Sequence, residues 1–108
     1  MDIQEMSAED AAARLQGGET VFMDVRDGGS YAASHIPGAM HVDDNTIADF
    51  LEDTPKDKPV VVYCYHGNAS RGGAAYLMSH GFQQVWSLAG GFEGWRGRHP
   101  EESGAGPV

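Results

Sequence analysis

The sequence is short of cysteine and of basic residues, and both shortages exclude classes of protein. Its 108 residues contain one cysteine, Cys64. A lone thiol cannot form an internal disulfide, a CxxC redox pair or a cysteine-based zinc cluster. Seven basic and sixteen acidic residues give a formal net charge of −9, which disfavours nucleic acids and anionic membrane surfaces as partners. The composition therefore predicts neither of these partners.

The chain also lacks a recognisable targeting or membrane-spanning segment. Its first ten residues, MDIQEMSAED, contain neither the basic region nor the apolar stretch of a signal peptide. No apolar run approaches the roughly 20 residues of a membrane-spanning helix. We therefore expect a cytoplasmic protein with a single domain over residues 1–100 and a loose tail over residues 101–108.

Short apolar runs alternate with helical patterns along the chain, which predicts an α/β fold. The run VVVY at residues 60–63 follows a proline and is typical of a central parallel strand. The segment 28–38 is expected to be mostly turn, with one helical turn. The other predicted strands cover residues 21–25 and 84–88. One predicted helix begins at residue 8 and is stopped by Gly17-Gly18, a second is marked by residues 47–51 and ended by Pro55, and two more cover 70–80 and 91–99. This alternation indicates three α/β/α layers, with a short parallel sheet flanked by helices.

Cys64 directly follows the VVVY strand, at the sheet edge where ligands bind in open α/β folds. Backbone N–H groups of a tight loop and the start of the next helix would favour a thiolate there. In such surroundings a thiol pKa falls from about 8.5 to roughly 3.5–7.5. Gly67 would permit the tight loop, while His66 and Arg71 would add positive charge. The alternative is a buried, inert thiol, because free cysteines are among the most buried residues.

Three segments resemble signatures of the rhodanese family of sulfurtransferases. Residues 64–70, CYHGNAS, are similar to the family's active-site loop, which often reads C-R-x-G-x-R-S. Residues 24–27 and 35–39, DVRD and HIPGA, resemble D-V-R…G-H-I-P-G-A. Residues 87–95, SLAGGFEGW, resemble L-x-G-G-x-x-x-W. The segments follow the family order and cover most of the chain, so the sequence resembles a single-domain rhodanese.

The resemblance implies a ping-pong transfer of sulfur without a cofactor or a metal. The Cys64 thiolate would attack the outer sulfur of thiosulfate, release sulfite and retain a persulfide. An acceptor would then remove that sulfur, either cyanide in an assay or a dithiol protein such as thioredoxin. The loop implied to bind the substrate and the persulfide comprises Tyr65, His66, Gly67, Asn68, Ala69, Ser70 and Arg71.

The loop departs from the family pattern at two positions where arginine is common. Tyr65 and Ala69 occupy these positions. His66, Arg71 or the loop backbone must then supply the positive potential for an anionic donor, and the sequence leaves that choice open. It equally leaves open the physiological donor and acceptor, and whether the chain is a monomer or a weak homodimer.

Two other functions compete with sulfur transfer. A Cys-dependent phosphatase or arsenate reductase needs an arginine six residues after the cysteine, to bind a tetrahedral oxyanion through two hydrogen bonds. Ser70 occupies that position and Arg71 comes one residue late, which disfavours this chemistry. A non-catalytic rhodanese-fold module, which binds a partner or senses sulfur, is the second alternative. Such modules often lack the cysteine that this chain has.

The remaining polar and aromatic candidates are expected to be structural. Asp24 and Arg26 are interpreted as a charge pair at a strand end, since a carboxylate close to the thiolate would raise the thiol pKa. The histidines outside the loop have no metal-ligand spacing with Cys64, which predicts no zinc site. The aromatic residues expected in the core, rather than in a binding platform, are Trp86, Trp95 and Phe92.

Overall fold

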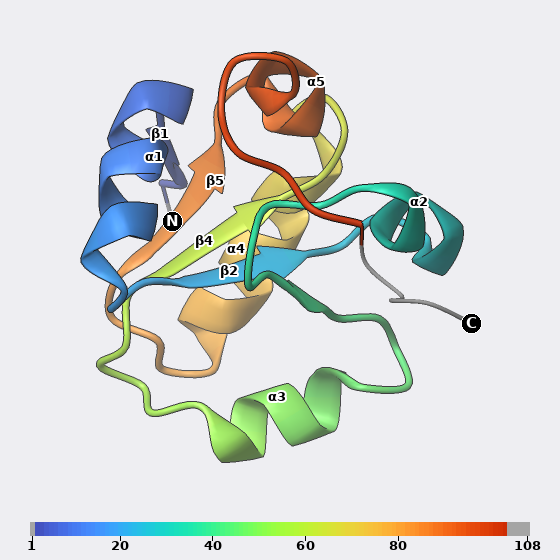
Figure 1. Ribbon diagram of the computed structural model, residues 1–108. Helices are drawn as coiled ribbons and strands as arrows, with labels where there is room; N and C mark the ends of the chain where they lie inside the picture. Colours follow the sequence, from blue (N-terminus) through green and yellow to red (C-terminus); the bar gives the residue numbers. More distant parts are fainter. Residues whose placement is uncertain (1, 104–108) are drawn as a thin grey trace.

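The computed structural model describes residues 2–103, which form a single parallel sheet with helices on both faces (Figure 1). The strands are β1 (Gln4–Met6), β2 (Val21–Asp24), β3 (Met40–His41), β4 (Val60–Tyr63) and β5 (Val85–Leu88). The helices are α1 (Ala8–Gly17), α2 (Gly28–Ala33), α3 (Ile47–Asp53), α4 (Ala69–Ser79) and α5 (Gly91–Trp95). The predicted three-layer α/β fold is confirmed.

The sheet has the strand order β1-β5-β4-β2-β3, and every neighbouring pair is parallel. The central strand β4 is fully buried along its length, as three consecutive valines predict for a strand covered on both faces. Its residue Val62 pairs with Met23 of β2 on one side and with Ser87 of β5 on the other. Cys64 therefore leaves the sheet at the carboxyl end of its middle strand.

Alternate residues of β4 point into two separate cores. Val61 and Tyr63 pack with α1 and α5, whereas Val60 and Val62 pack with α3 and α4. Figure 1 shows α4 behind the sheet and α3 below it. No helix in the described part of the chain is both long enough and apolar enough to cross a membrane.

The prediction from the sequence contains neither of the two edge strands, and it differs from the structure at helices α2 and α5. Strands β1 and β3 have three residues and two residues, so neither shows a readable alternation of apolar and polar side chains. Helix α2 fills part of the segment expected to be turn, because the Asp27 carboxylate caps it by accepting a hydrogen bond from the Ser30 N–H (3.0 Å). Helix α5 ends at Trp95, since Arg96 already has extended backbone angles.

Part of the segment expected to be a loose tail is hydrogen-bonded to the domain. The backbone N–H of His35 donates to the Glu102 carbonyl (2.8 Å), and the Glu102 N–H donates to the His35 carbonyl (2.9 Å). The Gly38 N–H donates to the Glu102 carboxylate (2.8 Å), which also lies 3.1 Å from Nε2 of His35. Residues 104–108 of the expected tail lie outside the described residues.

Candidate functional site

The Cys64 thiol is buried, with 7% of the residue exposed, and it lies at the centre of several hydrogen-bond donors. Its Sγ accepts hydrogen bonds from the backbone N–H groups of Gly67 (3.2 Å) and Ser70 (3.3 Å). The Ser70 hydroxyl oxygen lies 3.4 Å from the same sulfur. The chain thus forms the backbone nest that the position between β4 and α4 predicts.

These contacts decide the ionisation of the thiol. Burial alone would raise the pKa of Cys64, because it disfavours the charged form. Hydrogen bonds from the Ser70 hydroxyl and from the backbone N–H groups of Ser70, Gly67 and His66 outweigh burial and hold the pKa below the ordinary thiol value. A thiolate is the nucleophilic form of cysteine, so the geometry favours a reactive residue over an inert one.

Two glycines allow the loop to close tightly around the sulfur. Gly67 has φ +92°, and a Cβ atom there would lie 3.3 Å from the backbone nitrogen of Gly90. Gly91 has φ +59°, and its Cβ would lie 2.4 Å from the Tyr65 carbonyl oxygen. Only glycine suits such backbone angles at such close approach. Gly91 has no role in the expectations from the sequence, although it belongs to the quoted SLAGGFEGW segment.

The first turn of α5 holds the other side of the loop. The Phe92 N–H donates to the Cys64 carbonyl (2.8 Å), and the Glu93 N–H donates to the Tyr65 carbonyl (2.9 Å). These bonds direct the loop carbonyls away from the sulfur and towards α5. The N–H groups of Gly67 and Ser70 are then free to face the thiol, so α5 helps to keep the nest in a donating arrangement.

The other loop residues predicted for the site differ in their exposure and in their side-chain contacts. His66, Asn68 and Ala69 are exposed, and Tyr65 is half-buried. The Arg71 guanidinium forms an ion pair with Glu5 of β1 (2.9 Å). The contacts on Sγ come from the loop backbone and from the Ser70 hydroxyl.

Asp24 and Arg26 form the buried structural pair expected from the sequence. Arg26 Nη2 lies 2.7 Å from Asp24 Oδ2 and also donates to the Ser34 carbonyl (2.6 Å). Burial lowers the pKa of Arg26, but the hydrogen bonds and charge of Asp24 raise it overall. The guanidinium carbon lies 4.9 Å from the Tyr65 ring centroid. The pair therefore supports the loop through the side chain next to Cys64.

Ser87 is a polar residue of the site that sequence reasoning overlooked. Its hydroxyl oxygen lies 2.7 Å from that of Ser70, and both serines are fully buried. The sequence feature that could have indicated this role is a small hydroxyl residue inside an otherwise apolar strand, on the opposite face of the strand from Trp86. Its relation to Cys64 depends on the pairing of β5 with β4, which the sequence does not display.

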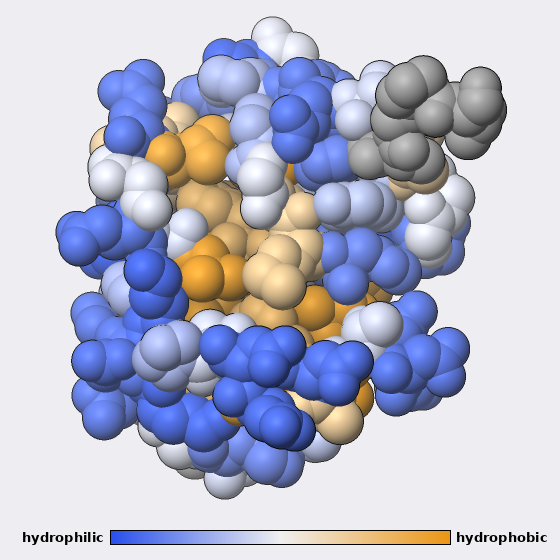
Figure 2. All heavy atoms as spheres, turned by 60° about the horizontal axis from the view of Figure 1, so that its bottom comes forward, coloured by the Kyte–Doolittle hydropathy of each residue, from blue (hydrophilic) through white to orange (hydrophobic). Residues whose placement is uncertain are grey.

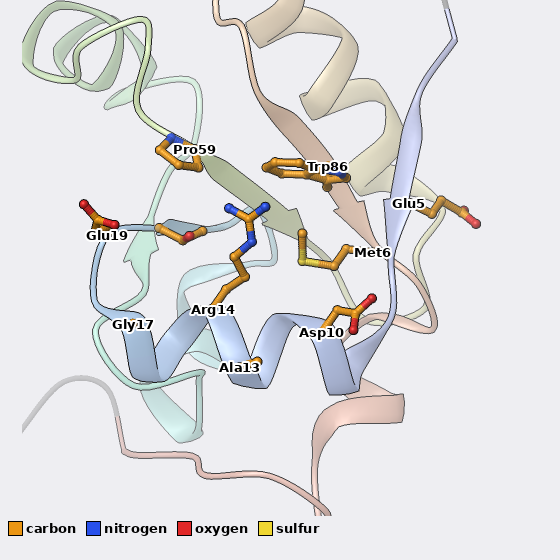
Figure 3. A pocket seen from close by; sticks show the side chains of 10 residues that line it. Glu5, Met6, Asp10, Ala13, Arg14, Gly17, Glu19, Pro59 and Trp86 are labelled. Carbon is orange, nitrogen blue, oxygen red and sulfur yellow. The ribbon is translucent and has the colours of Figure 1, made fainter.

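One hollow on the described part of the molecule lies away from Cys64. It has a volume of about 600 Å³, lies between α1, β1 and β5, and contains none of the predicted loop residues in its lining (Figure 3). Arg14 covers the Trp86 ring there, with its guanidinium carbon 4.6 Å from the ring centroid. Trp86 lines this hollow and is only half-buried against the core, so its expected place in the core is wrong. Trp95 and Phe92 are core residues as expected.

A smaller hollow of about 390 Å³ lies between the end of β2, α3 and α4. Figure 2, which brings the α3 side of the molecule forward, shows apolar surface bordered by hydrophilic side chains. Val25 and Ile47 contribute apolar lining, and Asp43 and Asp44 contribute acidic lining. Cys64 is not among the lining residues of either hollow.

Comparisons with known proteins agree with this geometry. The model of the rhodanese-like domain family matches residues 7–98. A thiosulfate sulfurtransferase GlpE of Pseudomonas fluorescens is 54% identical over 95 residues, covering 88% of this chain and 85% of the relative. One from Pseudomonas entomophila is 45% identical over 105 residues, covering 97% and 95%.

Solved structures show the same architecture. A rhodanese-like domain from Anabaena sp. superposes with a TM-score of 0.81 at 29% identity, covering 95% of this chain and 80% of that one. The family match spans the strand, loop and helix that form the Cys64 site. By its sequence, its fold and the loop around Cys64, the chain belongs to the rhodanese-like domain family.

Proposed function

We propose that the protein is a thiosulfate sulfurtransferase that carries sulfane sulfur as a persulfide on Cys64. The observation that carries the proposal is the cluster of donors on Sγ, which lowers the thiol pKa although the residue is buried. The relatives described above bear the name of this activity. An inert core cysteine would have no need of inward-facing backbone N–H groups.

The proposed first step is a displacement at sulfur. The Cys64 thiolate attacks the outer sulfur of thiosulfate, forming a new S–S bond as the original S–S bond breaks. The electron pair of that bond leaves with sulfite, and the negative charge of the enzyme moves to the outer sulfur of the persulfide. Cyanide then attacks the outer sulfur, leaves as thiocyanate and restores the thiolate.

The loop backbone stabilises the anion in both states of this cycle. The N–H groups of Gly67 and Ser70 face Sγ in the structure, and preorganised donors of this kind need no rearrangement as charge develops. We propose that the loop that binds the substrate and the persulfide extends from Tyr65 to Arg71. His66 and Arg71 are the exposed basic side chains of this loop, and Arg71 forms a surface ion pair with Glu5.

A dithiol protein such as thioredoxin is the proposed acceptor in the cytoplasm. With a single cysteine, the chain cannot release its persulfide sulfur by forming an internal disulfide. An acceptor with two thiols can form the required disulfide within itself. The first thiol takes the sulfur, and the second displaces it as hydrosulfide while the acceptor becomes a disulfide.

Mass spectrometry of the intact protein tests the proposal. Incubation with thiosulfate is expected to add the mass of one sulfur atom to the wild type, and cyanide is expected to remove it with formation of thiocyanate. Cys64→Ser is the matched control and should stay unmodified. A wild-type chain that stays unmodified while a known rhodanese is loaded in parallel would favour the non-catalytic module. Hydrolysis of an aryl phosphate that depends on Cys64 would instead favour the phosphatase.

A further inference from the structure

Ser87 has a buried hydroxyl with one hydrogen-bond partner in the described part of the chain. That partner is the hydroxyl of Ser70, at an oxygen–oxygen distance of 2.7 Å. Both serines have no exposed surface. A buried hydroxyl proton without an acceptor is costly, so the arrangement favours donation from Ser87 to the Ser70 oxygen.

The direction of this bond determines where the Ser70 proton points. A serine hydroxyl has one proton, and the Ser87 proton already occupies the contact between the two oxygens. The other close partner of the Ser70 oxygen is the Cys64 sulfur, at 3.4 Å. Once Cys64 is ionised, the Ser70 proton is directed to the sulfur, and the order of donation is Ser87 to Ser70 to Cys64. In the neutral thiol the S–H group donates to the Ser70 oxygen instead.

From this chain of contacts we infer that Ser87 is a positioning residue for the nucleophile, which orients and polarises the Ser70 hydroxyl towards the Cys64 thiolate. Hydrogen bonds in series strengthen one another, particularly in a low-dielectric interior. The register of the sheet puts Ser87 in place, because it pairs with Val62 of β4, two residues before Cys64. The inference extends the proposed sulfur transfer to a second buried hydroxyl at the same site.

Six acidic and basic side chains on the elements around the loop make no hydrogen bond to the thiol. They are His66 on the loop, Arg71 on α4, Glu5 on β1, Asp24 and Arg26 at and after the end of β2, and Glu93 on α5. Arg71 is paired with Glu5, and Arg26 with Asp24. No side chain among these six donates a hydrogen bond to Sγ, so the serine pair is the side-chain contribution to be tested.

The test is the pH dependence of Cys64 alkylation by iodoacetamide, which reports thiolate formation and needs no sulfur donor. Ser87→Ala is expected to raise the thiol pKa by about half a unit, a roughly threefold change in the ionisation constant. Ser70→Ala should raise it by about one unit or more, because it removes the direct bond. The double variant should match Ser70→Ala alone, since Ser87 acts only through Ser70.

The sign of the shift identifies the donor. If Ser70 donated to Ser87 instead, Ser87→Ala would release the Ser70 proton to the sulfur and lower the thiol pKa. A lowered or unchanged pKa in Ser87→Ala would overturn the inference, as would additive shifts in the double variant. The limiting alkylation rate at high pH is expected to stay near the wild-type value, because the thiol is then fully ionised in both proteins.

Two further variants separate this role from a purely structural one. Ser87→Thr retains a hydroxyl and should keep the thiol pKa near the wild-type value; a rise as large as that expected for Ser87→Ala would contradict the inference. Ser79→Ala, at an exposed serine of α4, is the control for a serine-to-alanine change and should leave the pKa unchanged. Sulfur loading of the wild-type protein by thiosulfate is measured separately, because it tests the proposed sulfur transfer and not the role of Ser87. Loss of loading with the pKa shifts intact would reject sulfur transfer and retain the role of Ser87.

Discussion

The backbone of Gly91 passes so close to Tyr65 that a Cβ atom on residue 91 would lie 2.4 Å from the Tyr65 carbonyl oxygen. That oxygen accepts a hydrogen bond from Glu93, and the Cys64 carbonyl accepts one from Phe92. The N-terminus of α5 and the loop that begins at Cys64 therefore fit together as one unit. A glycine that carries no chemistry itself thus controls the shape of the site.

Replacing Gly91 with alanine is expected to disrupt this unit. The methyl group would collide with backbone atoms, and residue 91 has a left-handed φ of +59°. Together these effects should lower the free energy of unfolding by about 2–4 kcal/mol. They should also slow sulfur loading of Cys64, because the loop must move. Urea unfolding and loading followed by mass spectrometry measure the two effects.

Gly94→Ala is the matched control for this prediction. Gly94 lies in the same helix, and a Cβ there would meet nothing within 4 Å. We expect its loading rate to equal that of the wild type. Equal stability and equal loading in both alanine variants would show that the close approach of α5 to the loop has no consequence.

A second prediction concerns the buried pair of Asp24 and Arg26. Removal of one partner leaves the other charge without compensation in the interior, so Arg26→Ala should cost about 3–5 kcal/mol in unfolding free energy. The guanidinium also lies 4.3 Å from the Phe92 ring centroid, so packing beside the loop is lost as well. Chemical denaturation of the purified variant measures the change.

The exposed pair of Arg96 and Glu93 provides the comparison. Its side chains are about half-exposed and 4.0 Å apart, and such surface pairs contribute little to stability. Arg96→Ala should therefore change the unfolding free energy by less than about 1 kcal/mol. A similar loss in Arg26→Ala and Arg96→Ala would contradict a structural role for the buried pair.

The parts of the fold that were predictable from the sequence are those encoded by neighbouring residues. The VVVY run at residues 60–63 showed the central strand, and the position of Cys64 after it located the site. Ser87 was overlooked because its contact with Ser70 exists only once β5 lies beside β4. Glu102 was overlooked for a similar reason, since its partner His35 is 67 positions away. Contacts between distant segments leave no local pattern in the chain.

The contact of Glu102 with His35 gives a prediction about pH. Hydrogen bonding from the Gly38 N–H, and to a smaller extent the contact with His35, hold the pKa of Glu102 below its ordinary value. The stabilisation is therefore complete above the ordinary carboxyl pKa of about 4.3. It is lost as the pH falls through the lowered pKa of the folded protein.

Thermal melting across a pH series tests this relation. Glu102→Gln should melt below the wild type near neutral pH, and the difference should shrink as the pH falls below about 4.3. Glu52→Gln serves as the control, because the exposed Glu52 side chain of α3 makes no hydrogen bond or ion pair within residues 2–103. A difference between Glu102→Gln and the wild type that persists unchanged into acid would mean that the carboxylate charge does not hold this segment.

The last prediction uses two adjacent glycines of α4, whose first turn supplies Ser70 to the site. Gly72 is exposed, and a Cβ there meets nothing within 4 Å. Gly72→Ala should therefore stabilise the protein by about 0.5–1 kcal/mol, because alanine favours the helix. A Cβ on Gly73 would instead lie 3.1 Å from a methyl group of Val62.

Gly73→Ala should lose that helical gain and more, since overpacking of a core costs about 1–3 kcal/mol. Any shift of α4 away from β4 also moves the Ser70 N–H relative to Sγ, so its sulfur loading should fall while that of Gly72→Ala stays at the wild-type rate. Urea unfolding and mass spectrometry of the loaded protein measure both variants. If Gly73→Ala proves as stable and as active as Gly72→Ala, the close seating of α4 on β4 does not determine the geometry of the nest.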